Sequence, residues 1–179
     1  MSDILTERLV LRTVPLAGLR ATADGDRDAA ARLIGGRLPE EWFDDAWVHA
    51  MRFDQWSADP DYGPWSIRAV AEKSTGQIVG NMNCHHKPMP FVLAGETLLA
   101  VEAGYTIFAD WRRRGYAGEM LAGFIAWAKS LGVEGLVLSI APGNVASRAL
   151  AARLGAQQIG SQIDEIDGPE DIFFARFPT

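Results

Sequence analysis

The sequence predicts an α/β (α+β) fold in which helices flank a mixed, twisted β-sheet. Two neighbouring segments carry this prediction. Apolar residues recur at steps of four and three along residues 117–131, from Ala117 to Leu131, which is the spacing of one buried helix face. The run Leu136–Ile140 that follows is short and apolar, as expected of a buried strand. The remaining elements add further strands and helices on either side.

The first part of the chain predicts one strand and then a series of helices. Pro15 ends the strand. Pro39 and the two glutamates after it are typical of a helix start, because proline suits the first turn and acids suit the positive end of the helix dipole. That helix would carry Phe43, Trp47 and Ala50 on one face. We expect the strand at residues 8–14 and helices at 16–22, at 26–34 and from 39 onward.

The rest of the chain predicts most of the sheet. Lys129 and Gly132 mark the end of the helix at 117–131, because a cation suits the last turn and glycine suits the stop. Asn144 is a natural N-cap for the next helix. The expected strands are 65–71, 77–86, 98–107, 136–140, 156–163 and 172–177, the expected helices are 117–131 and 144–155, residues 87–96 form a proline-containing connection, and residues 167–169 form a turn.

Length and composition favour one globular domain that spans residues 1–179. The chain has 179 residues, of which 48% are hydrophobic and 22% charged, and no repeat or linker divides it. Its net charge of −6 argues against nucleic acid as a partner, because a polyanion needs a cationic surface. Both a monomer and a homodimer are compatible with the sequence, and residues 172–175 are expected to offer an apolar strand edge to a second copy.

The chain has the features expected of a cytoplasmic protein. No apolar run approaches the length of a membrane span, and the first seven residues lack the basic start and apolar core of an export signal. Cys84 is the only cysteine, which excludes an internal disulfide and fits a reducing compartment. We therefore expect a cytoplasmic location and no membrane partner.

The most informative segment of the chain lies where the expected strand at 98–107 gives way to the helix at 117–131. Residues 112–114 are three arginines at this point, and Gly115 follows them. A helix N-terminus has backbone N–H groups without partners and about half a positive charge, so it binds phosphate. Gly115 allows a bulky anion to approach the backbone. The segment therefore suits a pyrophosphate, and a solvated basic turn is the alternative.

Two motifs in this part of the chain resemble those of the GNAT N-acetyltransferase superfamily. Arg112-x-x-Gly115-x-Ala117 is similar to the acyl-CoA pyrophosphate loop of that family, Q/R-x-x-G-x-G/A. Asn144-Val-Ala-Ser147 resembles its second CoA motif, and the order and separation of the two motifs also match. Two further segments are similar to the branch that includes ribosomal-protein N-terminal acetyltransferases, namely Glu102–Ile107 and Thr6–Arg12.

The resemblance implies a fold, a co-substrate and a set of contacts. The implied fold is the acyl-CoA N-acyltransferase type, with a mostly antiparallel sheet of six to seven strands. The strands before the two motif helices splay apart in this family, and the pantetheine of acetyl-CoA lies in the opening. The implied co-substrate is acetyl-CoA, and no metal is expected. The implied cofactor-binding residues are Tyr105, Thr106, Ile107, Arg112, Arg113, Arg114, Gly115, Tyr116, Ala117, Asn144 and Ser147.

Acetyl transfer to an amine requires an uncharged nucleophile, for which a base is useful. Glu102 is the candidate base, with a solvent-facing carboxylate or an ion pair as the structural alternative. Many relatives carry a tyrosine on the second motif helix that protonates the departing thiolate, but Ala151 stands at that position here. Ser147, Tyr105 or a water molecule could serve instead, or no acid is needed, because a thiol with a pKa near 8.5 leaves readily.

An aromatic and acidic segment at residues 42–65 is the candidate acceptor side. Most of its aromatic residues are expected to pack on the sheet. In the resembled family, however, the helices before the second strand line the acceptor side, so some of these residues are expected to receive a cationic amine. The candidate residues are Trp42, Asp44, Asp45 and Trp47.

The triplet at residues 84–86, Cys84-His85-His86, suggests a zinc site or a cysteine nucleophile. On a strand only Cys84 and His86 share a face, and a structural zinc needs four ligands. His49 is the only other histidine in the chain. A buried thiol and surface imidazoles are therefore the favoured interpretation.

The resemblance thus implies an acetyl-CoA-dependent N-acetyltransferase that acts by direct attack of an amine in a ternary complex. The acceptor suggested by the branch is a protein or peptide N-terminus, and a small-molecule amine is the alternative. The missing tyrosine keeps a different class open, a domain that binds acyl-CoA as a sensor or structural partner without transferring the acyl group.

Overall fold

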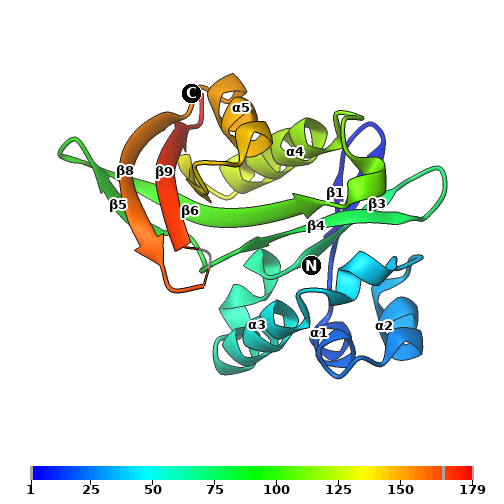
Figure 1. Cartoon of the computed structure of the whole chain (residues 1–179). Helices are drawn as coiled ribbons and strands as arrows, with labels where there is room; N and C mark the ends of the chain where they lie inside the picture. The colour runs from blue at the N-terminus through cyan, green and yellow to red at the C-terminus, as the bar shows by residue number, and fades with distance from the viewer. Residues whose placement is uncertain (1, 167, 179) are drawn as a thin grey trace. The chain divides into compact units, whose positions relative to one another are not determined.

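The computed structural model describes residues 2–166 and 168–178 (Figure 1). The chain divides into two compact units, one formed by Met1–Lys87 and Tyr105–Phe124, the other by Pro88–Gly104 and Ile125–Thr179. One strand, β6 (Glu96–Ile107), and one helix, α4 (Tyr116–Ser130), contribute residues to both units. The fold class is the predicted one, a mixed α/β fold with a mostly antiparallel sheet and flanking helices.

The first unit contains an antiparallel sheet with helices packed on it. Its strands pair in the order β1-β2-β3-β4. Figure 1 shows α1, α2 and α3 gathered on one side of these strands. The elements are β1 (Ile4–Leu5), β2 (Leu9–Thr13), α1 (Leu16–Ala23), α2 (Arg27–Ile34), α3 (Ala46–Ala58), β3 (Arg68–Glu72) and β4 (Ile78–Cys84), with short 3-10 helices η1 (Glu40–Phe43), η2 (Pro60–Trp65) and η3 (Ala109–Trp111).

The core of the first unit joins these helices to β3 and β4. Leu19 of α1, Ile34 of α2 and Trp42 of η1 pack with Ala69 and Ile78 of the sheet. Trp42 is only 1% exposed, and its Nε1 donates a hydrogen bond of 3.0 Å to Thr22 Oγ1, so the indole brings no unpaired donor into the core.

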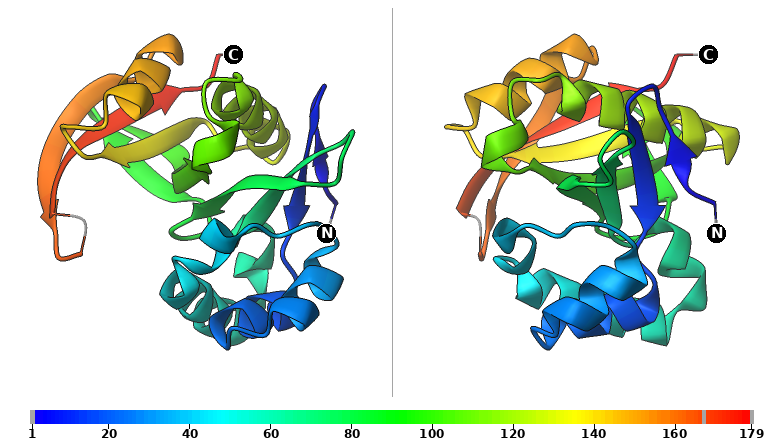
Figure 2. Two further views of the ribbon diagram at one scale, coloured as in Figure 1. Left: turned by 45° about the vertical axis from the view of Figure 1, so that its right-hand side comes forward. Right: turned by 90° about the vertical axis from the view of Figure 1, so that its right-hand side faces the viewer.

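The second unit contains the remaining strands. β6 pairs in parallel with β7 (Gly135–Ile140), which pairs antiparallel with β9 (Gly168–Arg176). β8 (Gln157–Asp164) is the next strand beyond β9, and Figure 2 shows the two as a long curved hairpin. α5 (Val145–Arg153) packs on β7. Leu98, Val137 and Phe174 belong to the core of the second unit. The ring of Phe91 stacks on that of Phe174, with 5.2 Å between the ring centroids.

The irregular connection predicted at residues 87–96 is wrong, because it contains the strand β5 (Met89–Leu93). β5 pairs antiparallel with β6. Pro90 lacks an N–H group, which masks the strand in the sequence but is tolerated where a strand pairs on one side only. With β5 and the two-residue β1, the described residues contain nine strands rather than six or seven.

Two expected apolar faces are also corrected by the structure. Pro39 precedes a 3-10 turn, η1, and α3 begins only at Ala46, so Phe43 and Trp47 do not share one helix face. Trp47 is 47% exposed, whereas Trp42 occupies the core. Leu131 lies beyond the end of α4 and is also exposed. The helix is interrupted between Phe43 and Trp47, and α4 ends before Leu131. The spacing of a continuous helix therefore does not apply to these residues.

The strand edge predicted at residues 172–175 is not free. β9 lies between β7 and β8, so its backbone groups are paired on both sides. β8 is the strand beyond it, and its Ile163 is largely exposed. Asp167, the first residue of the predicted turn, lies outside the described residues. In the ranges 2–166 and 168–178, no helix combines the length and apolarity that crossing a bilayer requires.

Candidate active site

The turn before α4 contains a row of backbone N–H groups without partners in the described part of the chain. The N–H groups of residues 113–118 donate no hydrogen bond to any residue that the structure describes. The first helical bond in this turn runs from Glu119 N–H to the Gly115 carbonyl, at 3.1 Å. Gly115 has a φ of 81°, which glycine adopts without steric cost. These N–H groups and the positive end of the helix dipole form a site suited to an anion.

The three arginines of this turn, which the sequence could not rank, differ in what they contact. Arg112 Nε donates to the Ile107 carbonyl at 2.8 Å, and Arg114 Nη2 donates to the Asp110 carbonyl at 2.9 Å. Both side chains therefore hold the turn together. Arg113 is exposed, has a φ of 58°, and makes no hydrogen bond or ion pair with the described part of the chain. Its charge is available to a ligand.

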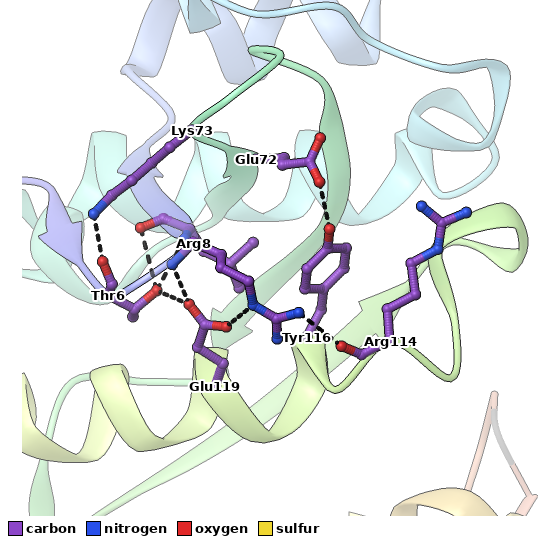
Figure 3. A network of polar contacts seen from close by, with 8 residues as sticks. Thr6, Arg8, Glu72, Lys73, Arg114, Tyr116 and Glu119 are labelled. Carbon is purple, nitrogen blue, oxygen red and sulfur yellow. Dashed lines mark hydrogen bonds and ion pairs between the residues drawn. The ribbon is translucent and has the colours of Figure 1, made fainter.

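Tyr116 and Ala117 begin α4, directly after this turn. The Tyr116 side chain is 5% exposed, and its hydroxyl donates a short hydrogen bond to Glu72 on β3, which raises the pKa of the phenol. Figure 3 shows the ring reaching from the start of α4 to Glu72. Tyr116 therefore offers a ligand its backbone N–H rather than its hydroxyl.

The remaining residues that the resemblance implies for acetyl-CoA binding before the turn are the last three of β6. Tyr105, Thr106 and Ile107 end this strand, and the Ile107 carbonyl is occupied by Arg112. The next residue, Phe108, donates its N–H to the Val79 carbonyl at 3.0 Å. The strand end and the turn are thus held to β4 within the first unit.

Glu102 lies in the second unit, on β6, and is half-buried. Its Oε1 accepts a hydrogen bond of 2.7 Å from the Ser139 hydroxyl on β7. The parallel ladder of β6 and β7 pairs Ala100–Glu102 with Gly135–Val137, so both side chains lie close to its end. Sequence reasoning did not select Ser139. The available signal was a hydroxyl in the otherwise apolar run 136–140.

The second CoA motif forms the start of α5. Asn144 is the N-cap, and its Oδ1 accepts the Ser147 N–H at 3.1 Å. The explanation of Asn144 as an N-cap is therefore confirmed, and its amide nitrogen donates no hydrogen bond to any residue that the structure describes. The Ser147 side chain is half-exposed. Ala151 is fully buried, so the position where many relatives have tyrosine belongs to the core.

The candidate acceptor residues are divided between core and surface. Trp42 is buried and supports this region only by packing. Asp44 and Asp45 are exposed, as is Trp47. The Asp45 carbonyl contacts Nδ1 of the buried His49 at 3.2 Å. Of the four candidate residues, the two acids and one indole are therefore accessible to solvent.

Cys84 is a buried thiol at the end of β4. Burial raises its pKa to about 12, so the thiolate that a nucleophile or a zinc ligand requires is disfavoured. Tyr62 donates its hydroxyl to the Cys84 carbonyl at 2.6 Å. Within the described ranges, no three His, Cys, Asp or Glu side chains are grouped as metal ligands.

Comparison with known proteins identifies the family of this chain. The model of the acetyltransferase (GNAT) domain matches residues 8–157. An acetyltransferase from Agrobacterium tumefaciens strain C58 is 24% identical, with 97% of this chain and 94% of that chain covered and a TM-score of 0.61.

Two further solved structures have the same fold. For the ribosomal-protein-S5-alanine acetyltransferase of Vibrio fischeri the identity is 15%, the coverage 97% and 96%, and the TM-score 0.65. For RimJ of Mycobacterium smegmatis, solved in complex with CoA-disulfide, the values are 17%, 99% and 90%, and 0.58. Since the domain model matches well over half of its residues, the chain belongs to the GNAT acetyltransferase family and is an acyltransferase.

Proposed function

We propose that this protein is an acetyl-CoA-dependent N-acetyltransferase that transfers the acetyl group to a primary amine by direct attack in a ternary complex. The observation that carries the proposal is the row of N–H groups at residues 113–118 that pair with no described residue, next to the available cation of Arg113. The family match spans residues from both compact units, which supports one functional domain over residues 1–179.

The donor is proposed to bind through its diphosphate to the start of α4. The N–H groups of Gly115, Tyr116 and Ala117 would contact the phosphate oxygens, and Arg113 would add a charged contact. The amide of Asn144 and the hydroxyl of Ser147 are proposed contacts to the pantetheine. The bound donor supplies an activated thioester, so the residues of the chain need to bind, orient and move protons.

Glu102 is the proposed base. An α-amino group is about one-tenth neutral at pH 7, and a lysine far less, so a base that removes the ammonium proton raises the reactive fraction. The Ser139 hydroxyl holds Oε1 of Glu102, and a backbone N–H at residues 105–107 is proposed to stabilise the charge that develops on the thioester oxygen. Ser147, Tyr105 or water would protonate the leaving thiolate, unless it leaves without an acid.

A protein or peptide N-terminus is the proposed acceptor, supported by the ribosomal-protein acetyltransferases among the similar structures. The exposed Asp44, Asp45 and Trp47 suit a cationic amine. A small-molecule amine is the alternative, and a screen of peptides and small amines with acetyl-CoA, monitored by free thiol, separates the two.

Replacement of Asp44 and Asp45 together by Asn is expected to raise the KM of the acceptor more than that of the donor.

Calorimetry with CoA and acetyl-CoA tests the donor site directly. Binding of both is expected, and no heat with either would contradict the proposal. Binding without thiol release over a broad amine panel would instead favour an acyl-CoA sensor.

Glu102→Gln tests the catalytic role. We expect kcat to fall by about 10²- to 10⁴-fold, with the Kd of acetyl-CoA unchanged, because Gln keeps the shape but cannot accept the proton. Glu134→Gln, at an exposed acid of the same unit, is the matched control and should leave kcat unchanged. Equal turnover by Glu102→Gln and the wild type would remove Glu102 from the mechanism.

A further inference from the structure

Arg8 connects the start of β2 to the turn that precedes α4 (Figure 3). Its Nε donates to Glu119 Oε2 at 2.7 Å, and its Nη1 donates to the Arg114 carbonyl at 3.0 Å. Its guanidinium also lies over the Tyr116 ring, 4.7 Å from the centroid. Three contacts from one planar group therefore hold the turn and the first residues of α4.

The bond to Arg114 determines where the next N–H group points. The Arg114 carbonyl and the Gly115 N–H belong to one trans peptide, in which the two groups point in opposite directions. Because the carbonyl faces Arg8, the Gly115 N–H faces away from Arg8. It is one of the N–H groups that donate to no described residue. Arg8 thus orients a donor of the anion site without occupying it.

Arg8 is itself held in position by neighbouring groups. Its backbone N–H donates to Glu119 Oε1 at 2.6 Å, and the Thr6 hydroxyl donates to the same oxygen at 2.6 Å. Lys73 donates to the Thr6 carbonyl. A Cβ at Gly123 would collide with Thr6 Cγ2, so the glycine lets α4 approach this segment closely. The geometry at Arg8 is therefore determined from both sides.

The pair also balances charge near the anion site. Partial burial would raise the pKa of Glu119, but the hydrogen bonds from Thr6 and Arg8 outweigh it and lower the pKa, so the carboxylate is ionised. An unpaired carboxylate in the first turn of α4 would repel a diphosphate, and Arg8 neutralises it. Since an ion pair as exposed as this one adds little to stability, the orientation of the turn is the larger effect.

We propose that Arg8 is a positioning residue for donor binding, which holds the Arg114 carbonyl so that the Gly115 N–H faces the diphosphate of acetyl-CoA. This inference rests on the proposed function. It predicts a defect only for donors that contain the diphosphate.

The test compares Arg8→Met with the wild type on two donors, acetyl-CoA and S-acetylpantetheine, which lacks the diphosphate. The KM and Kd of acetyl-CoA are expected to rise roughly tenfold to a hundredfold, the range for loss of hydrogen bonds to charged groups, with kcat little changed. The kcat/KM for S-acetylpantetheine should equal that of the wild type, which also shows that the variant is folded. Arg8→Lys, which keeps the charge but not the fork, should recover only part of the affinity.

Arg20→Met is the matched control, because Arg20 also pairs through Nε with a carboxylate, Asp24, and lies over a ring, Phe53. It should behave as the wild type with both donors. An unchanged KM for acetyl-CoA in Arg8→Met, or an equal loss with both donors, would overturn the inference. Failure of the wild type to bind CoA would instead contradict the proposed function itself.

Discussion

At the scale of single residues, the chain places titratable groups in unusual surroundings. His49 lies on α3, is 1% exposed and contacts the Trp42 ring at 5.0 Å between centroids. Its Nε2 has no hydrogen-bond partner among the described residues. Burial lowers its pKa from 6.5 to about 4, despite the bond to the Asp45 carbonyl. The folded protein therefore carries this imidazole in its neutral form.

This burial predicts a loss of stability in mild acid. Below pH 6.5 the unfolded chain binds a proton at His49 that the folded chain does not, so the free energy of unfolding falls by about 1.4 kcal/mol per pH unit until the pH approaches the folded pKa. Above pH 6.5 the effect vanishes. Denaturant unfolding measures this free energy at each pH. In His49→Phe it should change less with pH between about 4 and 6.5 than in the wild type. A slope equal to that of the wild type in His49→Phe would contradict this prediction.

At the scale of elements, α5 tests the two explanations of the second CoA motif. Asn144→Ala removes the cap bond to the Ser147 N–H and should lower the free energy of unfolding by about 1 kcal/mol. Ser147→Ala keeps that bond, because it uses the backbone, and should leave stability almost unchanged. Denaturant unfolding measures both. If Asn144→Ala is as stable as Ser147→Ala, capping does not explain the asparagine.

The elements that could be predicted from sequence are those whose signal is local. The apolar spacing at 117–131 predicts α4 to within one residue at each end, and the run at 136–140 predicts β7. The proline in β5 hides this strand from prediction. A proline fits a strand that pairs on one side only, and whether β5 does so depends on its place beside β6 rather than on its own residues. The sequence likewise predicts one helix where the structure has η1 and α3. The interruption between them results from tertiary packing around Trp42, which local spacing does not report.

The candidate site follows the same division. The turn at 112–117 is contiguous, so the sequence could predict that these residues come together at the start of a helix, while their affinity for an anion stays a prediction. Arg8 and Glu119 are 111 positions apart, and Glu102 and Ser139 are 37 apart, so no spacing rule connects them. Such pairs depend on strand register and on the packing of α4, which the sequence does not specify locally.

At the scale of the whole molecule, the single cysteine reports on global opening. Cys84 is buried in the first unit with its pKa raised to about 12, so a thiol reagent should react only when the protein unfolds. Acetyl-CoA, which has no free thiol to consume the reagent, should slow this reaction about a hundredfold at about 100 times its Kd, because ligand binding favours the folded state. Labelling followed by mass spectrometry measures the rate, with unfolded protein as the reference. Rapid labelling of the native protein would mean that β4 opens locally.

The backbone conformation of Arg113 lowers the stability of the folded protein. A side chain at a φ of 58° disfavours the folded backbone by about 1 kcal/mol, whereas glycine adopts this conformation freely. Arg113→Gly would thus relieve the backbone and at the same time delete the one guanidinium of the turn that contacts no described residue. We therefore expect Arg113→Gly to be more resistant to heat and, under the proposed donor site, to bind the anionic ligand less tightly.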